Sequence, residues 1–209
     1  MRVAFTGIAG AGKTTAALAL QREYGGEIRS FASPLKIAAR MIGWDGKKDP
    51  KGRWLLQRLG DEGRAVDPLL FVNIAFRDLS DSVYIDDLRF PNEAEAARAH
   101  GFVIVRVERV VPTPSPDGTG ANFGPQGDPV DGPHRAAKYL SPVHSRTLEA
   151  ALRRLANQYF DPSFTPPDYR GHKSETAVNL VEPDFVIPND GSLAAFEARV
   201  RELVPCLTP

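Results

Sequence analysis

The sequence has little of what marks secreted, zinc-binding or membrane-spanning proteins. Its single cysteine, Cys206, cannot form an internal disulfide, and no Cys/His cluster has zinc-site spacing. Lys+Arg and Asp+Glu both number 26, and this balance argues against a broad nucleic-acid surface. No apolar run reaches the roughly 20 residues of a membrane span. The first residues enter an expected strand directly, which leaves no room for a signal peptide. A cytoplasmic protein without membrane or nucleic-acid partners is expected.

Short apolar segments alternate with helical patterns along the chain. Strands are expected at 2–6, 27–31, 82–86, 102–107 and 184–187. Helices are expected after the first strand and at 34–42, 53–65, 69–79, 92–100, 144–159 and 193–204. This alternation predicts an α/β fold with a five-stranded parallel sheet covered on both faces. Ligands of such sheets bind at the carboxyl ends of the strands.

One region breaks the alternation. Residues 112–133 contain six prolines and five glycines, which disfavour regular structure. Long loops of this kind inside a compact domain are often lids or binding loops. We therefore expect one domain over residues 1–209 with a lid insertion at 110–175, before the last strand.

Residues 7–15, GIAGAGKTT, match the phosphate-binding pattern G-x-x-x-x-G-K-[ST]. The strand before them and the helix formers after them supply the context that this pattern needs. Glycines allow backbone N–H groups to face an anion, and the helix N-terminus adds its positive dipole end. Lys13 is expected to reach the β- and γ-phosphates of a nucleotide, and Thr14 to bind Mg²⁺. The structural alternative is a glycine-rich turn with a surface lysine. The motif refines the expected fold to a three-layer α/β/α P-loop architecture.

Among P-loop proteins, the sequence favours a small kinase. A GTPase would need an N-K-x-D guanine-reading motif late in the chain, and none occurs. Oligomeric ATPases usually have a second domain. A P-loop ATPase or nucleotide-binding module, with an insertion that docks a partner, is the alternative from another class.

The third strand runs into Asp86, Asp87 and Arg89. An aspartate at this strand end commonly holds Mg²⁺ through water, and an arginine fork fits phosphate oxygens. Asp87 and Arg89 are therefore candidates for catalysis, with Asp87 and Thr14 as metal ligands. The alternative is that both residues cap the following helix.

The region 32–80 offers candidates for binding a second anionic substrate. Lys36 lies in an expected first helical turn, although it also fits an ordinary solvated lysine. Arg53, Gln57 and Arg64 recur at helical spacing, as a pocket wall or a partly buried helix would. Phe71 is placed to stack on a base, or to lie in the core.

Six stretches together resemble the bacteriophage deoxynucleoside monophosphate kinases, within the P-loop nucleoside monophosphate kinase family. They occur in the family's order and span nearly the whole chain, at 31–36 (FASPLK), 53–60 (RWLLQRLG), 87–93 (DLRFPNE), 106–109 (RVER), 172–175 (HKSE) and 184–192 (DFVIPNDGS). The insertion at 110–171 departs from the pattern by its length.

The resemblance implies transfer of the ATP γ-phosphoryl group to a deoxynucleoside monophosphate, with Mg²⁺ as cofactor. The residues implied for ATP are Gly10, Ala11, Gly12, Lys13, Thr14, Thr15, Asn189 and Asp190, the last two beside adenine. Those implied for the acceptor are Lys36, Arg53, Gln57, Arg64, Phe71, Arg89 and Glu93. His172 and Glu175 would close the lid. A homodimer in the host cytoplasm is also implied. A kinase of another phosphorylated metabolite is the nearer alternative.

Overall fold

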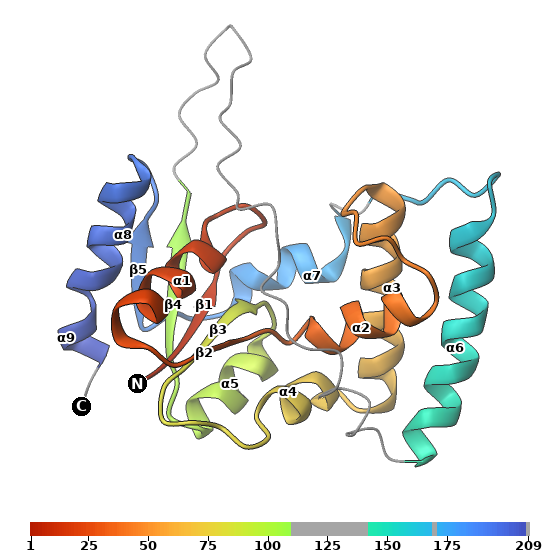
Figure 1. Cartoon of the computed structure of the whole chain (residues 1–209), viewed down its shortest axis with the longest axis horizontal. Coiled ribbons are helices and arrows are strands. Elements are labelled where there is room, and N and C mark those ends of the chain that lie inside the picture. The colour runs from red at the N-terminus through yellow and green to blue at the C-terminus, as the bar shows by residue number, and fades with distance from the viewer. Residues whose placement is uncertain (110–141, 169–170, 208–209) are drawn as a thin grey trace, which may run out of the picture. The chain divides into compact units, whose positions relative to one another are not determined.

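A computed structural model describes residues 1–109, 142–168 and 171–207. Contacts divide the chain into two compact units (Figure 1). Unit 1 comprises 1–30, 78–130 and 177–209, and unit 2 comprises 31–77 and 131–176. Most of the expected lid, including the proline-rich stretch 112–133, lies outside the described residues. In the described part of the chain, no helix is long and apolar enough to cross a membrane.

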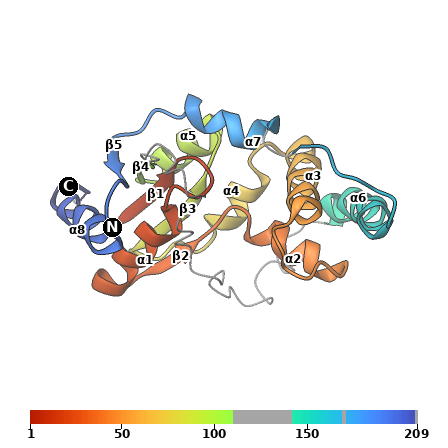
Figure 2. The same ribbon diagram turned by 90° about the horizontal axis from the view of Figure 1, so that it is seen from above.

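Unit 1 is built on a parallel sheet of five strands, as the alternating pattern predicts. The strands are β1 (Arg2–Thr6), β2 (Glu27–Arg29), β3 (Val83–Leu88), β4 (Val103–Glu108) and β5 (Phe185–Pro188), in the order β2-β3-β1-β4-β5. Helices α1 (Lys13–Tyr24) and α8 (Leu193–Glu202) lie on one side of the sheet and α5 (Pro91–Ala99) on the other (Figure 2). The carboxyl end of the central strand β1 therefore lies at the middle of the sheet's carboxyl edge.

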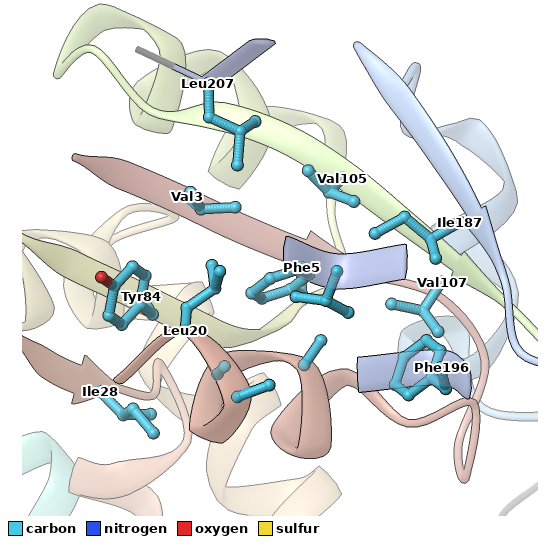
Figure 3. Close-up of a cluster of buried hydrophobic side chains, with 14 of the residues drawn as sticks. Val3, Phe5, Leu20, Ile28, Tyr84, Val105, Val107, Ile187, Phe196 and Leu207 are labelled. Carbon is cyan, nitrogen blue, oxygen red and sulfur yellow. The ribbon is translucent and has the colours of Figure 1, made fainter. Parts of the chain in front are cut away.

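A hydrophobic cluster fixes α1 and α8 on their face of the sheet. Phe5 and Tyr84 from the strands pack with Leu20 of α1 and Phe196 of α8, all at most 1% exposed (Figure 3). The short α9 (Val204–Leu207) adds Leu207 to the same cluster. Burial of these large side chains stabilises the layer that carries the loop between β1 and α1.

The pairing of β1 with β3 contains one irregularity. Ala4 lies opposite Ile85, but Thr6 lies opposite Leu88, so β3 has one extra residue in the interval that contains Asp86 and Asp87. Such a bulge interrupts the alternation of side chains between the two faces of a sheet. The two aspartates therefore cannot be assigned to faces by counting along the strand.

Unit 2 is helical. Its elements are α2 (Ser33–Met41), α3 (Pro50–Val66), α4 (Leu70–Ala75), α6 (Pro142–Phe160) and α7 (Lys173–Thr176). Helix α3 contacts α2, α4 and α6. Its Trp54 ring packs on Phe164 with 4.6 Å between ring centroids. The 3-10 helix η3 (Ala177–Leu180), which follows α7, belongs to unit 1.

Several helix and strand boundaries differ from the expected ones. Helix α3 begins at Pro50 rather than Arg53, because Asp49 caps it through a 2.7 Å hydrogen bond from the Gly52 N–H. Strand β3 continues to Leu88, two residues beyond the expected end. Helix α4 covers only Leu70–Ala75 of the expected 69–79.

Two glycines of α3 give a matched test of packing in unit 2. A Cβ on Gly63 would lie 2.2 Å from the Phe71 ring, whereas one on Gly60 would meet only the end of the flexible Arg64 side chain, at 2.8 Å. Helix propensity favours alanine over glycine by about 1 kcal/mol, but overpacking a core costs about 1–3 kcal/mol. We expect Gly63→Ala to lower the free energy of unfolding in urea and Gly60→Ala to leave it unchanged or raise it. Equal effects of the two substitutions would contradict this packing.

Candidate functional site

The loop from Gly7 to Gly12, here called the glycine loop, joins β1 to α1 at the carboxyl edge of the sheet. Gly7 has φ of 139°, and a Cβ there would lie 2.4 Å from the Val107 carbonyl oxygen. Gly12 has φ of 110°, and a Cβ there would lie 2.7 Å from the side-chain nitrogen Nδ2 of Asn189. Both positions therefore require glycine for conformation and for space.

Lys13, the first residue of α1, folds back onto this loop. Its Nζ donates hydrogen bonds of 2.8 Å to the carbonyl oxygens of Gly7 and Ile8. The residue is only 8% exposed. A buried ammonium group thus lies within the loop, next to the N-terminus of a helix, where the dipole also favours an anion.

The next residue, Thr14, contacts β3 through Asp86. The Thr14 hydroxyl donates a 2.7 Å hydrogen bond to Asp86 Oδ2. The Asp87 Oδ2 instead accepts a 2.6 Å hydrogen bond from the hydroxyl of Ser30, directly after β2. The sequence predicts Thr14 and Asp87 as metal ligands, whereas the carboxylate that contacts Thr14 in the structure is that of Asp86. The bulge in β3 is the reason that the sequence did not identify it.

Thr14 and Asp86 form a small set of oxygen donors. Mg²⁺ prefers oxygen ligands and is usually held by only one or two protein groups, together with waters and substrate phosphates. The pair fits that pattern. Among residues 1–109, 142–168 and 171–207, no cluster of three or more His, Cys, Asp or Glu side chains forms a metal site.

Arg89 and Glu93 follow β3, and their roles differ. Arg89 directly follows the last residue of the strand, at the carboxyl edge of the sheet. Glu93 is 4% exposed, and its Oε2 accepts hydrogen bonds from the N–H groups of Arg89 (2.9 Å) and Phe90 (3.1 Å). Glu93 thereby caps the start of α5, so its carboxylate has a structural task where an acceptor contact was expected.

Asn189 and Asp190 follow β5. The Asn189 Nδ2 donates a 2.8 Å hydrogen bond to the carbonyl oxygen of Ala11 in the glycine loop. Asp190 pairs with Arg199 of α8, and the hydrogen bond from Arg199 holds the pKa of Asp190 below its usual value. The two residues expected beside adenine are thus engaged with the loop and with α8.

Arg109 directly follows β4 and ends the RVER stretch, from which the sequence predicts no role for it. Its guanidinium NH1 donates a 3.2 Å hydrogen bond to the carbonyl oxygen of Gly10. Arg109 lies near the glycine loop because β4 pairs in parallel with β1, and no local sequence pattern reveals that pairing.

The other expected acceptor residues belong to unit 2. The Arg53 Nε donates to the Lys48 carbonyl oxygen at 3.0 Å. The Arg64 guanidinium lies 5.7 Å from the centroid of the Phe71 ring, a cation–π contact. Phe71 itself is 6% exposed and packs against Gly63, as a core residue does. Lys36 lies in the first turn of α2, and Gln57 lies in the middle of α3.

A second polar cluster in unit 2 surrounds Asp61 of α3. His172 Nε2 lies 3.0 Å from Asp61 Oδ2, and Lys173 Nζ lies 3.0 Å from Oδ1. Burial alone would raise the pKa of Asp61, but hydrogen bonds from His172 and Lys173 outweigh it and lower this pKa. The cluster ties α7 to α3, which is a structural role for the histidine that was expected to close a lid.

No family model matches the sequence. The fold can be compared with the crystal structure of a sugar kinase from Janibacter sp. HTCC2649, an unliganded structure. The sequence identity is 15%, the TM-score is 0.39, and the comparison covers 100% of this chain and 98% of that one. This likeness is too weak to carry a conclusion.

A relative in sequence is the uncharacterized protein ORF77 of Ictalurid herpesvirus 1 (strain Auburn). It is 33% identical over 213 residues, which cover 97% of this chain and 70% of the viral protein. The match thus extends over nearly the whole chain. The chain belongs to the family of this herpesvirus protein.

Proposed function

We propose that this protein is an ATP-dependent phosphotransferase whose acceptor is a deoxynucleoside monophosphate. The observation that carries the proposal is the glycine loop at the carboxyl edge of a parallel sheet, with a buried lysine inside it and a threonine–aspartate pair beside it. Loops of this composition before a helix bind the phosphates of nucleotides.

The donor side of the reaction follows from these groups. Lys13 would exchange its carbonyl contacts for the β- and γ-phosphate oxygens of ATP. Thr14 and Asp86 would hold Mg²⁺, whose charge would offset that of the phosphate oxygens. Positioning and charge compensation of this kind account for most of the catalysis in phosphoryl transfer.

Charge supports a phosphorylated acceptor. Although the chain is neutral overall, unit 2 has 16 Lys and Arg against 10 Asp and Glu, a formal charge of +6. Unit 1 has 10 against 16, a formal charge of −6. The proposed acceptor residues Lys36, Arg53 and Arg64 thus belong to the cationic unit. A cationic unit favours an anionic substrate through its long-range field.

The chemistry of the acceptor also favours a monophosphate. A hydroxyl acceptor, such as that of a neutral sugar, needs a general base to take its proton. A monophosphate has a second pKa of about 6, so its attacking oxygen is already ionised at neutral pH. Arg89 would then orient two anions whose repulsion is the main obstacle to transfer.

The test is acceptor dependence. Purified protein is incubated with MgATP and each common deoxynucleoside monophosphate in turn, and ADP and deoxynucleoside diphosphate are quantified. We expect equal amounts of both products with at least one monophosphate. The unphosphorylated deoxynucleosides serve as matched controls and should give no product.

Other results would identify the alternatives. Rapid ADP formation without any acceptor would favour an ATPase with a docking insertion. ADP formation that requires another phosphorylated metabolite would keep the kinase but change its acceptor. If the protein neither forms ADP nor binds ATP under any of these conditions, the proposal is overturned.

A further inference from the structure

Side-chain donors hold several carbonyl oxygens of the glycine loop. Arg109 donates to Gly10 and Asn189 to Ala11, at 3.2 and 2.8 Å. Lys13 donates to the first two carbonyls of the loop, and the Gly12 carbonyl accepts from the N–H of Ala16 in α1. Arg109 and Asn189 differ from Lys13 because they come from outside the loop and its helix.

Asn189 is well placed to act on the loop. Its own N–H donates a 2.7 Å hydrogen bond to the Glu108 carbonyl at the end of β4, which anchors its backbone to the sheet. Its amide nitrogen occupies the space where a side chain on Gly12 would begin, 2.7 Å from the Cβ position. The absence of a side chain at Gly12 thus allows Asn189 to reach the carbonyl of Ala11.

The planar trans peptide converts this contact into an orientation. In a peptide group the carbonyl of one residue and the N–H of the next point in opposite directions. A donor that holds the Ala11 carbonyl therefore turns the Gly12 N–H to the opposite side of the peptide. Gly12 is the N-cap of α1, so its N–H adjoins the first-turn N–H groups of that helix.

Arg109 acts on the neighbouring peptide. Holding the Gly10 carbonyl orients the Ala11 N–H, which donates a 3.2 Å hydrogen bond to the Ile8 carbonyl. This hydrogen bond closes the turn from Ile8 to Ala11 at the top of the loop. Arg109 is exposed, so its contact stabilises the turn without being part of the hydrophobic core.

From these contacts we infer that Asn189 and Arg109 are positioning residues for the glycine loop, and that they fix the loop in its phosphate-binding shape. The inference rests on the proposed function, and it assigns Asn189 a task other than contact with adenine. Loops whose N–H groups are already oriented bind anions without an ordering cost. Loss of either contact should weaken phosphate binding even when no base is present.

The experiment separates phosphate binding from base recognition. Binding of inorganic tripolyphosphate, with Mg²⁺, is measured by calorimetry for the full chain and for Asn189→Ala, Asn189→Asp and Arg109→Ala. A single hydrogen bond of net worth near 1 kcal/mol predicts about a fivefold loss of affinity for each alanine variant. Asn189→Asp should lose more, because a carboxylate would face the Ala11 carbonyl. The ratio of ATP to GTP affinity should stay unchanged in all variants.

Matched substitutions control for general effects. Arg22→Ala removes an exposed arginine of α1 that pairs with Glu197, and Asn73→Ala removes an exposed asparagine of unit 2 that bonds Asp67. Both should keep wild-type affinity for tripolyphosphate. If Asn189→Ala does not fold, Arg109→Ala still tests the inference, because Arg109 is exposed and its truncation should leave the protein folded.

Two outcomes overturn the inference in different ways. If Lys13→Met abolishes tripolyphosphate binding but the Asn189 and Arg109 variants bind like wild type, the positioning role is wrong and the proposed function stands. If Asn189→Ala changes the ATP-to-GTP ratio but not tripolyphosphate affinity, Asn189 contacts the base instead. Absence of binding to the wild-type chain would overturn both the inference and the proposed function.

Discussion

Lys13→Met should lower phosphoryl transfer at least about a hundredfold, the usual effect of removing one preorganised donor to a developing charge. Lys13 is buried, and its ammonium lies among the loop carbonyls at 2.8 Å. Methionine keeps the length and apolar stem of the side chain but has no charge to offer a phosphate. The effect should therefore fall on binding and transfer of the γ-phosphoryl group rather than on the fold.

The measurement is the steady-state rate of diphosphate formation, with circular dichroism to establish that the variant is folded. Lys47→Met is the matched control, since Lys47 is an exposed lysine of unit 2 that pairs with Asp45 at 3.0 Å. It should retain the wild-type rate. A folded Lys13→Met protein with a rate within threefold of wild type would remove the glycine loop from the mechanism.

Asp86→Asn should reduce turnover about 10- to 100-fold, the range seen when a group next to a metal site is altered. Thr14 donates to Asp86 at 2.7 Å, so loss of the carboxylate charge acts directly beside the expected Mg²⁺. Asp87→Asn should have a much smaller effect, because the asparagine oxygen can still accept the 2.6 Å hydrogen bond from Ser30.

The concentration of Mg²⁺ that gives half-maximal rate distinguishes the two aspartates. It should rise for Asp86→Asn and stay near the wild-type value for Asp87→Asn. Adjacent positions and identical substitutions make each variant the control for the other. The reverse order of effects would restore Asp87 as the metal residue suggested by the sequence.

The sheet could be predicted because its signals are local. Each strand is a short apolar segment followed by a helical pattern, and the parallel arrangement follows from that alternation. The glycine loop could be predicted for the same reason, because its motif and flanking elements are contiguous. The end of β2 was misjudged by two residues, since Arg29 is the last residue that pairs with β3.

The surroundings of the loop could not be predicted in the same way. The choice between Asp86 and Asp87 depends on a bulge in the pairing with β1, which is a property of two strands rather than one. Arg109 and Asn189 reach the loop because β4 pairs with β1, and β5 in turn pairs with β4. The close packing of Phe71 likewise depends on a glycine eight positions earlier, Gly63, which the sequence analysis did not connect with it.

The hydrogen bond between Asn189 and Ala11 has a consequence for the order of events during protein synthesis. The two residues are separated by 178 positions, although the loop itself is among the first segments that the ribosome makes. A nascent chain that ends before β5 lacks both the strand and the amide that hold the loop. Incomplete translation products should therefore bind phosphate more weakly than the full chain, and the full affinity should arise only late in the growth of the chain.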